Sequence, residues 1–423
     1  MTSPPVVLGL RRNRDFTLLW WGEGVSVLGN ATTVVLVPLL AVTGLGAGAG
    51  WVGVLTAAAW LPWLLVGLPA GAWIDERSPR RVMIAADLTA AATLISVPLA
   101  WFAGALTLPH LATAALLNGV STVFFRTAYV KLVTAVVDPS QLEAANGRLM
   151  GTESAMQIGG QGLAGLLVRL VGAVGGLVVD VVSFLVSAAC LWRIHTPDTE
   201  QRTAPPEPLV ARIRAGITAV VHDPYLRALT VIGGASNFGL TGINTLTVIF
   251  CLRSLDLQPS LVGYVLAIGS TGAVVGATVA RRISVRWGSG RASTWLLVSS
   301  GLSGLLVPLA TPDAGVIWFV LGMFALGLSV VAGNVVRGAW RQRYVPAPML
   351  ARVVTTTQMI NYGTMPAAAL TAGVLGESLG LRATLVIMAV INALACASVV
   401  ATRLGPLREL PTRGDLGTLT AGA

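Results

Sequence analysis

Charged residues are scarce in this sequence. Of its 423 residues, only 11% are Asp, Glu, Lys or Arg, whereas 54% are hydrophobic. In a typical soluble domain about a quarter of the residues are charged, so this chain has too few charges to cover a surface in water. The composition excludes the several soluble domains that the length would allow, and it indicates one membrane-embedded unit.

Residues that form disulfides, metal sites and catalytic clusters are also few. The three cysteines lie far apart, each in or beside an apolar run, and the three histidines are scattered. The cysteines lack the spacing of a disulfide framework or a zinc site. The sequence also lacks the phosphate-binding motif Gly-x-x-x-x-Gly-Lys-Ser/Thr. We therefore expect no enzyme activity, no metal and no cofactor.

The positive charges are distributed as in a membrane protein. The formal net charge is +10, but the basic residues lie in short segments between apolar runs, so we expect no nucleic-acid partner. If the N-terminus is cytoplasmic, only Arg169, Arg253 and Arg382 of the 28 Lys and Arg residues lie away from the cytoplasmic side. This bias predicts a multi-pass protein of the cell membrane with both termini in the cytoplasm.

Long apolar runs recur throughout the chain. A helix needs about 20 apolar residues to cross a bilayer, and only helices satisfy their own backbone hydrogen bonds in lipid when no closed barrel is formed. The sequence therefore predicts an all-α membrane protein with twelve transmembrane helices. The predicted spans are 17–41, 50–73, 82–104, 108–130, 149–171, 174–194, 226–251, 260–280, 292–311, 315–336, 353–376 and 382–403.

A polar, proline-rich stretch divides these spans into two sets of six. Residues 195–224 are too few and too polar for a domain, so they are predicted to be a cytoplasmic linker with one amphipathic turn around Val210–Val221. The predicted N-terminal bundle is 1–194 and the C-terminal bundle is 225–404. The Gly- and Thr-rich tail, 405–423, is expected to be disordered.

The two halves echo one another. A glycine-ended helix and a short basic loop follow the second span, from Gly71 to Arg81, and recur after the eighth span, from Gly276 to Arg282. Internal repeats of this kind are typical of secondary transporters.

These stretches resemble the major facilitator superfamily. Gly71…Asp75…Arg80-Arg81 resembles its loop 2–3 signature. The entry to the first span, Asn13–Gly22, resembles the superfamily's bacterial efflux branch, which includes macrolide-efflux-like and siderophore-exporter-like members. Two further stretches are similar to loops 4–5 and 10–11 of that branch, and the whole resemblance covers roughly residues 11–404. The two stretches are Asp138–Asn146 and Pro346–Arg352.

The resemblance implies two six-helix bundles that work by alternating access, with helices 1, 4, 7 and 10 lining a cavity. It also implies a gating loop in which Asp75 holds the cytoplasmic side closed, with Arg126 as a candidate partner. The alternative is that these charges only set the topology. The gating residues implied are Gly71, Asp75, Arg77, Arg80, Arg81 and Arg126.

Glu23 is the sharpest individual candidate for ion coupling. It lies in the first span, about one turn after Trp20 and Trp21. An ionisable group in a span is costly and marks a functional position, and a carboxylate there can bind and release a proton. The hypothesis is that Glu23 couples transport to proton movement. The alternative is a glutamate that extends to the cytoplasmic interface.

Three other acids lie in the predicted spans. Asp87 is expected to form a structural pair with nearby loop arginines, and Glu153 to begin the fifth span as a partner of the helix dipole. Asp180 is followed by Ser183 and Phe184, a pattern that resembles the sixth helix of the family and is interpreted as structural.

Asparagines supply most of the remaining polarity of the spans. Asn237 and Asn244 are seven residues apart and share a helix face. They suit a cavity wall that holds a polar ligand, although polar residues in membranes also bond helix to helix. The cavity-lining candidates are Asn30, Asn118, Asn237, Asn244, Asn334 and Asn361.

The function expected from these features is secondary active transport, as a monomer, of a small amphipathic molecule such as an antibiotic or natural product, exported in exchange for protons. A siderophore exporter or a solute importer of the same fold is an alternative. From another class, a non-transporting membrane sensor or an intramembrane enzyme would need a fixed site that the sequence does not contain.

Overall fold

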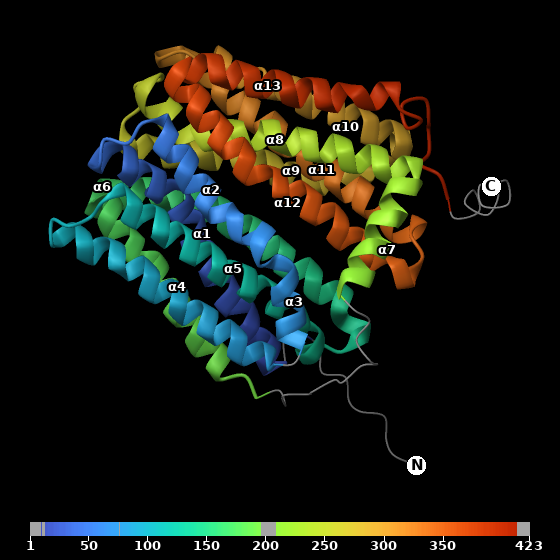
Figure 1. The fold of residues 1–423 in the computed structure, drawn as a ribbon, viewed down its shortest axis with the longest axis horizontal. Helices are drawn as coiled ribbons and strands as arrows, with labels where there is room; N and C mark the ends of the chain where they lie inside the picture. Colours follow the sequence, from blue (N-terminus) through green and yellow to red (C-terminus); the bar gives the residue numbers. More distant parts are fainter. Residues whose placement is uncertain (1–9, 11–12, 76, 196–208, 413–423) are drawn as a thin grey trace. The chain divides into compact units, whose positions relative to one another are not determined.

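The computed structural model describes residues 10, 13–75, 77–195 and 209–412, and these residues are helical apart from their connections (Figure 1). The α-helices are α1 (Arg14–Gly44), α2 (Ala49–Leu65), α3 (Gly67–Asp75), α4 (Pro79–Phe102), α5 (Leu108–Val136), α6 (Leu142–Trp192), α7 (Leu209–His222), α8 (Pro224–Arg253), α9 (Pro259–Trp287), α10 (Ser289–Gly304), α11 (Val316–Tyr344), α12 (Ala347–Ser378) and α13 (Leu381–Ala397). The four 3-10 helices are Pro139–Gln141, Val307–Leu309, Asp313–Gly315 and Ser398–Ala401. The predicted all-α fold is confirmed.

Local sequence signals set where these helices begin. The side chain of Asn13 accepts a hydrogen bond from the backbone N of Phe16 and so caps α1. Ser78 caps α4, which has proline in its first turn, and Asp223 caps α8 by accepting from two backbone N–H groups. Capping side chains satisfy N–H groups that have no partner inside the helix, and proline in the first turn loses no helical hydrogen bond.

The predicted twelve spans agree with the helices. Nine helical stretches in the described residues are long and apolar enough to cross a membrane. One of them, Pro139–Trp192, holds two of the predicted spans. The second predicted span corresponds to the shorter apolar helix α2 with α3, and the eleventh lies in α12.

The helix α6 consists of two arms that fold back on one another. They meet at Gly172, where φ is 74° and ψ is 171°, a backbone conformation that side chains with a Cβ rarely adopt. A Cβ built at Gly176 on the second arm would lie 3.2 Å from Cβ of Leu167 on the first arm. The fifth and sixth predicted spans are therefore two arms joined by one glycine.

The chain folds into two compact units. Unit 1 comprises Met1–Ala47, Ala58–Thr203 and Pro259–Ala267, and unit 2 comprises the remainder, Gly48–Ala57, Ala204–Gln258 and Ile268–Ala423. Each unit includes a short helical piece from the opposite half of the sequence. The predicted bundle boundaries, 1–194 and 225–404, stay a prediction.

In unit 1, α1 lies against both arms of α6. A Cβ at Gly160 would lie 2.5 Å from the backbone O of Leu28, and one at Gly29 would lie 2.3 Å from Oδ1 of Asp180. These separations are too short for a side chain, so the glycines let the helix backbones approach, as small residues commonly do in membrane helices. This close packing fixes the position of the polar face of α1.

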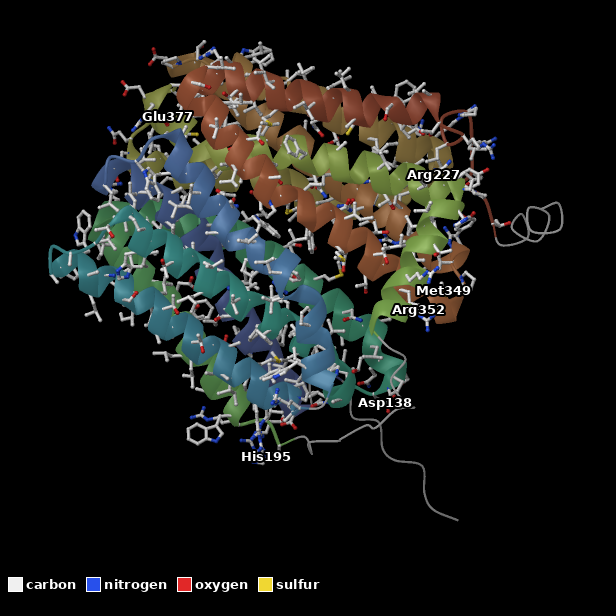
Figure 2. All side chains as sticks on the ribbon, viewed as in Figure 1. Asp138, His195, Arg227, Met349, Arg352 and Glu377 are labelled. Carbon is white, nitrogen blue, oxygen red and sulfur yellow. The ribbon has the colours of Figure 1, made fainter. Side chains whose placement is uncertain are left out.

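In unit 2, α8 packs against α12 and α13. A Cβ at Gly239 would lie 2.6 Å from the backbone O of Met388, so α8 and α13 also approach through a glycine. Arg227 and Arg352 lie at one end of this unit and Glu377 at the other (Figure 2).

Two expectations about the polar segments need correction. The linker contains a 14-residue helix, α7, rather than one amphipathic turn. The tail was expected to be disordered, but residues 405–412 pack against unit 2, where Leu410 is buried and the indole of Trp340 donates to the backbone O of Pro411. Apolar contacts and backbone hydrogen bonds explain this packing. The other predicted parts of these segments, 196–208 and 413–423, lie outside the described residues.

Candidate functional site

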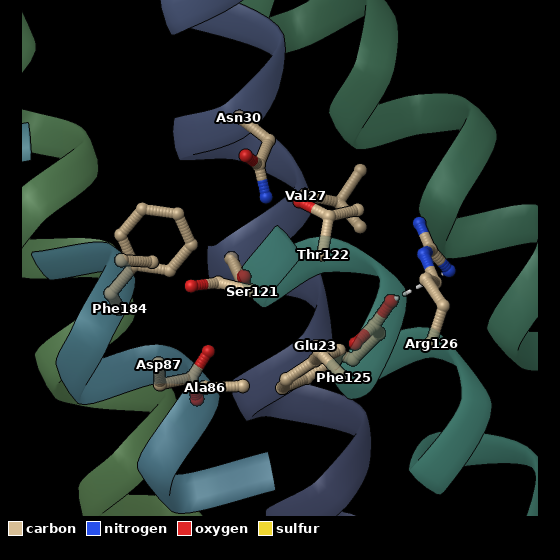
Figure 3. A pocket seen from close by; sticks show the side chains of 12 residues that line it. Glu23, Val27, Asn30, Ala86, Asp87, Ser121, Thr122, Phe125, Arg126 and Phe184 are labelled. Carbon is tan, nitrogen blue, oxygen red and sulfur yellow. Dashed lines mark ion pairs between the residues drawn. The ribbon is translucent and has the colours of Figure 1, made fainter. Parts of the chain in front are cut away.

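A polar pocket lies within unit 1 among α1, α4, α5 and α6 (Figure 3). Its cavity volume is about 30 Å³, which is room for a water molecule. Glu23 and Asn30 reach it from α1, Asp87 from α4 and Arg126 from α5. The other lining residues are Ser26, Val27, Ala86, Ala90, Ser121, Thr122, Phe125 and Phe184.

Two carboxylates compensate the charge of Arg126. Its Nη1 lies 3.1 Å from Oε1 of Glu23, and its Nη2 donates to Oε1 of Glu153 at 2.8 Å. The Glu23 side chain is only 6% exposed, whereas Arg126 and Glu153 are 34% and 44% exposed. The ion-pair network therefore runs from the buried interior of unit 1 to its surface.

The pocket also contains carboxylate oxygens without a hydrogen-bond partner. Oε2 of Glu23 and Oδ2 of Asp87 are both buried and have no partner among the described residues. Asp87 does accept a side-chain hydrogen bond from Ser187. Burying a bare carboxylate oxygen is costly because it loses its hydration, and binding a proton or a water removes much of that cost.

Charges of both signs surround the buried carboxylate of Glu23. Arg126 pairs with one of its oxygens, and Asp87 lines the same pocket and adds a second carboxylate. The pocket is therefore lined by two acids and one cation. The described residues contain no group of three His, Cys, Asp or Glu side chains that could hold a metal ion.

Glu153 and Asp87 differ from what the sequence analysis expected. Glu153 was expected at the beginning of the fifth span, but α6 begins at Leu142, so that expectation is wrong and its partner is Arg126 rather than a helix end. Asp87 faces the pocket with Glu23 and forms no ion pair among the described residues.

Asp180 has the contacts of a structural acid. It is fully buried and its Oδ2 accepts from the hydroxyl of Thr33 at 2.5 Å, while Oδ1 accepts from Ser183 at 2.9 Å. Both carboxylate oxygens therefore have partners, and the bond from Thr33 joins α1 to the second arm of α6.

The six predicted asparagines are divided between the two units, with Asn30 and Asn118 in unit 1 and the other four in unit 2. Asn30 lines the pocket, and Asn118 on α5 is half-buried with its Oδ1 lacking a partner. In unit 2, Asn237 is half-buried and Asn244 is exposed, although both are on α8. The remaining two are Asn334, which accepts from Arg337, and Asn361, whose Oδ1 is buried without a partner.

Five of the six predicted gating residues are in or beside the turn between α3 and α4, whereas the sixth, Arg126, is on α5 and pairs with Glu23 and Glu153. Gly71 is in α3 and Asp75 ends it, but the side chain of Asp75 lies outside the described residues. The guanidinium of Arg77 lies 3.6 Å from the ring centroid of Trp73, and Arg80 donates to the backbone O of Ile194. Arg81 donates its backbone N–H to the capping Ser78.

The sequence did not reveal two members of the pocket. Ser121 and Thr122 on α5 line it, and both hydroxyls also donate to backbone O atoms of their own helix. Short hydroxyl residues are common in membrane helices, so they carried no distinguishing signal. The one available signal was their distance from Arg126, roughly one turn along the same helix.

Comparison with known proteins agrees with the fold and identifies the family. The model of the Major Facilitator Superfamily matches residues 19–369. The chain belongs to this superfamily. It is therefore a transporter of the membrane-spanning, helical type rather than an enzyme.

Two superfamily relatives have efflux names. The chain is 27% identical over 408 residues to the multidrug efflux pump Tap of Mycobacterium tuberculosis, covering 93% of this chain and 94% of the relative. It is 20% identical over 404 residues to macrolide efflux protein A of Streptococcus pyogenes, covering 93% and 97%.

Solved structures share the fold at low sequence identity. The nucleoside transporter NupG superimposes with a TM-score of 0.76 at 11% identity, covering 92% of this chain and 98% of that one. A bacterial homologue of the iron transporter ferroportin gives a TM-score of 0.72 at 16% identity, covering 95% and 100%. These two likenesses concern the fold alone.

Proposed function

We propose that this transporter exports amphipathic small molecules, such as antibiotics or natural products, in exchange for protons. It works as a monomer in the cell membrane, with both termini in the cytoplasm. The efflux names of relatives that span almost the whole chain support the direction and the cargo class. The bias of basic residues toward one set of loops supports the orientation.

The observation that carries the proton coupling is the state of Glu23. One of its oxygens is paired with Arg126 and the other is buried without a partner in the described residues. Protonation of Glu23 releases Arg126 from that ion pair and leaves it with Glu153 alone. A proton therefore changes which groups hold α1 to α5, and this change links proton binding to helix movement.

The turn between α3 and α4 is the proposed gating element. Arg80 ties it to the end of α6 through the backbone O of Ile194, and Asp15 at the beginning of α1 accepts from the backbone N of His195. These two contacts join the beginnings of α1 and α4 to the end of α6 within unit 1. Asp75 ends α3 at this junction, and the proposal assigns it the gating role.

A transport assay in a host that lacks its own drug pumps tests the proposal. Expression of the chain is expected to raise the inhibitory concentration of a macrolide such as erythromycin, or of another member of a panel of amphipathic antibiotics, at least about fourfold. A protonophore should abolish the effect. Unchanged susceptibility across the whole panel would contradict drug export, and net uptake into right-side-out vesicles driven by an inward proton gradient would indicate the importer alternative.

A further inference from the structure

The helix α11 contains an arginine that lacks a carboxylate partner. Nη2 of Arg337 donates to Oδ1 of Asn334 at 2.9 Å, and Nη1 is buried with no hydrogen-bond partner among the residues that the structure describes. Within the described part of the chain, the ion pairs of this kind in the spans belong to Arg126, not to Arg337. Because a guanidinium stays charged at all physiological pH values, an uncompensated positive charge lies inside an apolar helix.

The guanidinium points into the span rather than toward the nearer end of the helix. A Cβ built at Gly333 would lie 2.7 Å from Nη1 of Arg337, so the side chain folds back over the preceding turn. The helix ends in the other direction, at Tyr344. An arginine near a helix end usually extends to the membrane surface, where water solvates its charge. Arg337 does not do this, and the glycine at 333 makes room for it.

Among the described residues, the polar groups around Arg337 in unit 2 provide no carboxylate, and Arg341 on the same helix adds a second positive charge. Arg337 interacts electrostatically with Cys396 on α13. Sγ of Cys396 contacts Oγ of Ser236 at 3.4 Å, and Ser236 donates to Oδ1 of Asn392 at 2.7 Å. Asn392 donates in turn to the backbone O of Ser300. This buried cluster joins α8, α10, α11 and α13, and Arg337 supplies its positive charge.

The fourth span provides an internal comparison. Arg126 on α5 also lies in a polar interior, but two carboxylates hold it. By the repeat in the sequence, α11 is the corresponding helix of the second half, and its arginine has only an asparagine. A buried ion without a counter-ion is strongly unfavourable. The buried position of Arg337 is explained if an anion from outside the chain pairs with its guanidinium.

We propose that Arg337 is an anion-binding residue of unit 2. The occupant is a monovalent anionic group, held by charge-assisted hydrogen bonds from Nη1. Its source is the carboxylate of a transported amphipathic molecule, which rests on the proposed export function, or a free halide such as chloride, which does not. Arg337 as a whole is half-buried, so its surroundings reach the surface of the unit.

Binding of salicylate and of chloride to the purified full-length protein in detergent tests the site. Salicylate is a small amphipathic carboxylate, and salicylamide is its uncharged analogue. The wild-type protein is expected to bind salicylate at least about tenfold more tightly than salicylamide, and anions are expected to raise its melting temperature. In Arg337→Gln, which removes the charge, the preference should disappear; Arg337→Lys should restore part of it.

The control is Arg343→Gln, which removes an exposed arginine from the same helix. If Arg343→Gln weakened salicylate binding as much as Arg337→Gln does, the proposal would be overturned. It would also be overturned if Arg337→Gln bound salicylate and chloride as tightly as the wild type. Without added anion, Arg337→Gln should melt at or above the wild-type temperature, because it removes an unpaired buried charge. Melting well below it would assign Arg337 a packing role and also overturn the proposal.

The binding assay also distinguishes a transported carboxylate from chloride as the source of the anion. It further distinguishes the anion site from the proposed export function. Salicylate binding that chloride does not displace identifies the transported molecule as the source of the anion, and displacement by millimolar chloride identifies the halide. Because binding in detergent needs no transport, an intact Arg337 effect together with unchanged antibiotic susceptibility would refute export while leaving the anion site in place.

Discussion

Nη1 of Arg126 lies 3.1 Å from Oε1 of Glu23, and the second oxygen of the same carboxylate is buried without a partner in the described residues. The ion pair and the bare oxygen make opposite demands on the protonation state of Glu23. A group under opposing demands responds to small changes around it, such as the approach of a substrate or a shift of α5.

Replacing Glu23 by Gln is expected to uncouple transport from protons. The amide keeps the size of the side chain but cannot release a proton, so transport driven by a pH gradient should fall at least about tenfold. Counterflow, which exchanges substrate across the membrane without a proton gradient, should continue. Proteoliposomes with an imposed gradient measure both rates.

The matched control is Glu153→Gln, which removes the other carboxylate of Arg126 from a position that is 44% exposed. It should retain proton-driven transport. If Glu23→Gln transported at the wild-type rate with the same pH dependence, Glu23 would not be the coupling residue.

Removing Arg126 should destabilise unit 1. In Arg126→Gln, Glu23 would stay buried without its cation, and an uncompensated buried charge typically costs several kcal/mol. Because Arg126 is 34% exposed, water reduces this cost, and we expect about 1–3 kcal/mol. Thermal unfolding in detergent measures the change.

The double variant Glu23→Gln with Arg126→Gln is expected to recover part of the lost stability, since neither charge is then left alone. A double variant no more stable than Arg126→Gln would mean that the arginine stabilises the unit through packing rather than through this ion pair.

The sequence predicted the helices well because their signals are local. Apolar length identified the spans, and it placed the beginnings of α1 and α4 within a few residues of where they lie. Glu23 was recognisable for the same reason, because a carboxylate within an apolar run stands out in any sequence. Asp180 was interpreted as a structural acid from its spacing to Ser183, which donates a hydrogen bond to it, and its structural role stays a prediction.

The partners of these residues were not predictable because they depend on tertiary packing. Glu23, Arg126 and Glu153 come from three helices, and the sequence alone does not set the rotation of those helices about their axes. Asp87 was assigned to the loop arginines because they are close in sequence, yet burial turns it toward Glu23. The tail looked disordered by composition, but hydrogen bonds to the beginning of α10 hold residues such as Glu409.

Gly29 is expected to tolerate no side chain. A Cβ there would lie 2.2 Å from Oγ of Ser183 and 2.3 Å from Oδ1 of Asp180, so Gly29→Val would force α1 away from α6 and break the hydrogen bonds of Asp180. Overpacking of this kind costs roughly 1–3 kcal/mol. The variant should give less folded protein by size-exclusion chromatography and a lower melting temperature.

The control for this prediction is Gly147→Ala, since a Cβ at Gly147 meets nothing within 4 Å and the residue is exposed on α6. Its melting temperature should equal or exceed that of the wild type, because alanine favours a helix over glycine. Equal effects of the two substitutions would show that close packing at Gly29 does not limit stability.

Glu409 gives the fold a pH-dependent contact outside the membrane spans. Its Oε2 accepts from the backbone N of Ser289 at 3.0 Å and from the Ser289 hydroxyl at 2.6 Å, and these bonds hold the pKa of Glu409 below its ordinary value of 4.5. A carboxyl whose pKa is lower in the folded state stabilises the fold above its unfolded pKa, and it loses that contribution as the pH falls through the folded pKa.

Glu409→Gln should therefore lower the melting temperature at pH 7, and the difference from the wild type should shrink as the pH is lowered toward 3. The control is Glu143→Gln, which removes a carboxylate from an exposed position on α6, and it should lower the melting temperature at pH 7 less than Glu409→Gln does. A Glu409→Gln difference that stays constant from pH 7 to pH 3 would show that the side chain holds the tail through its shape rather than through its charge.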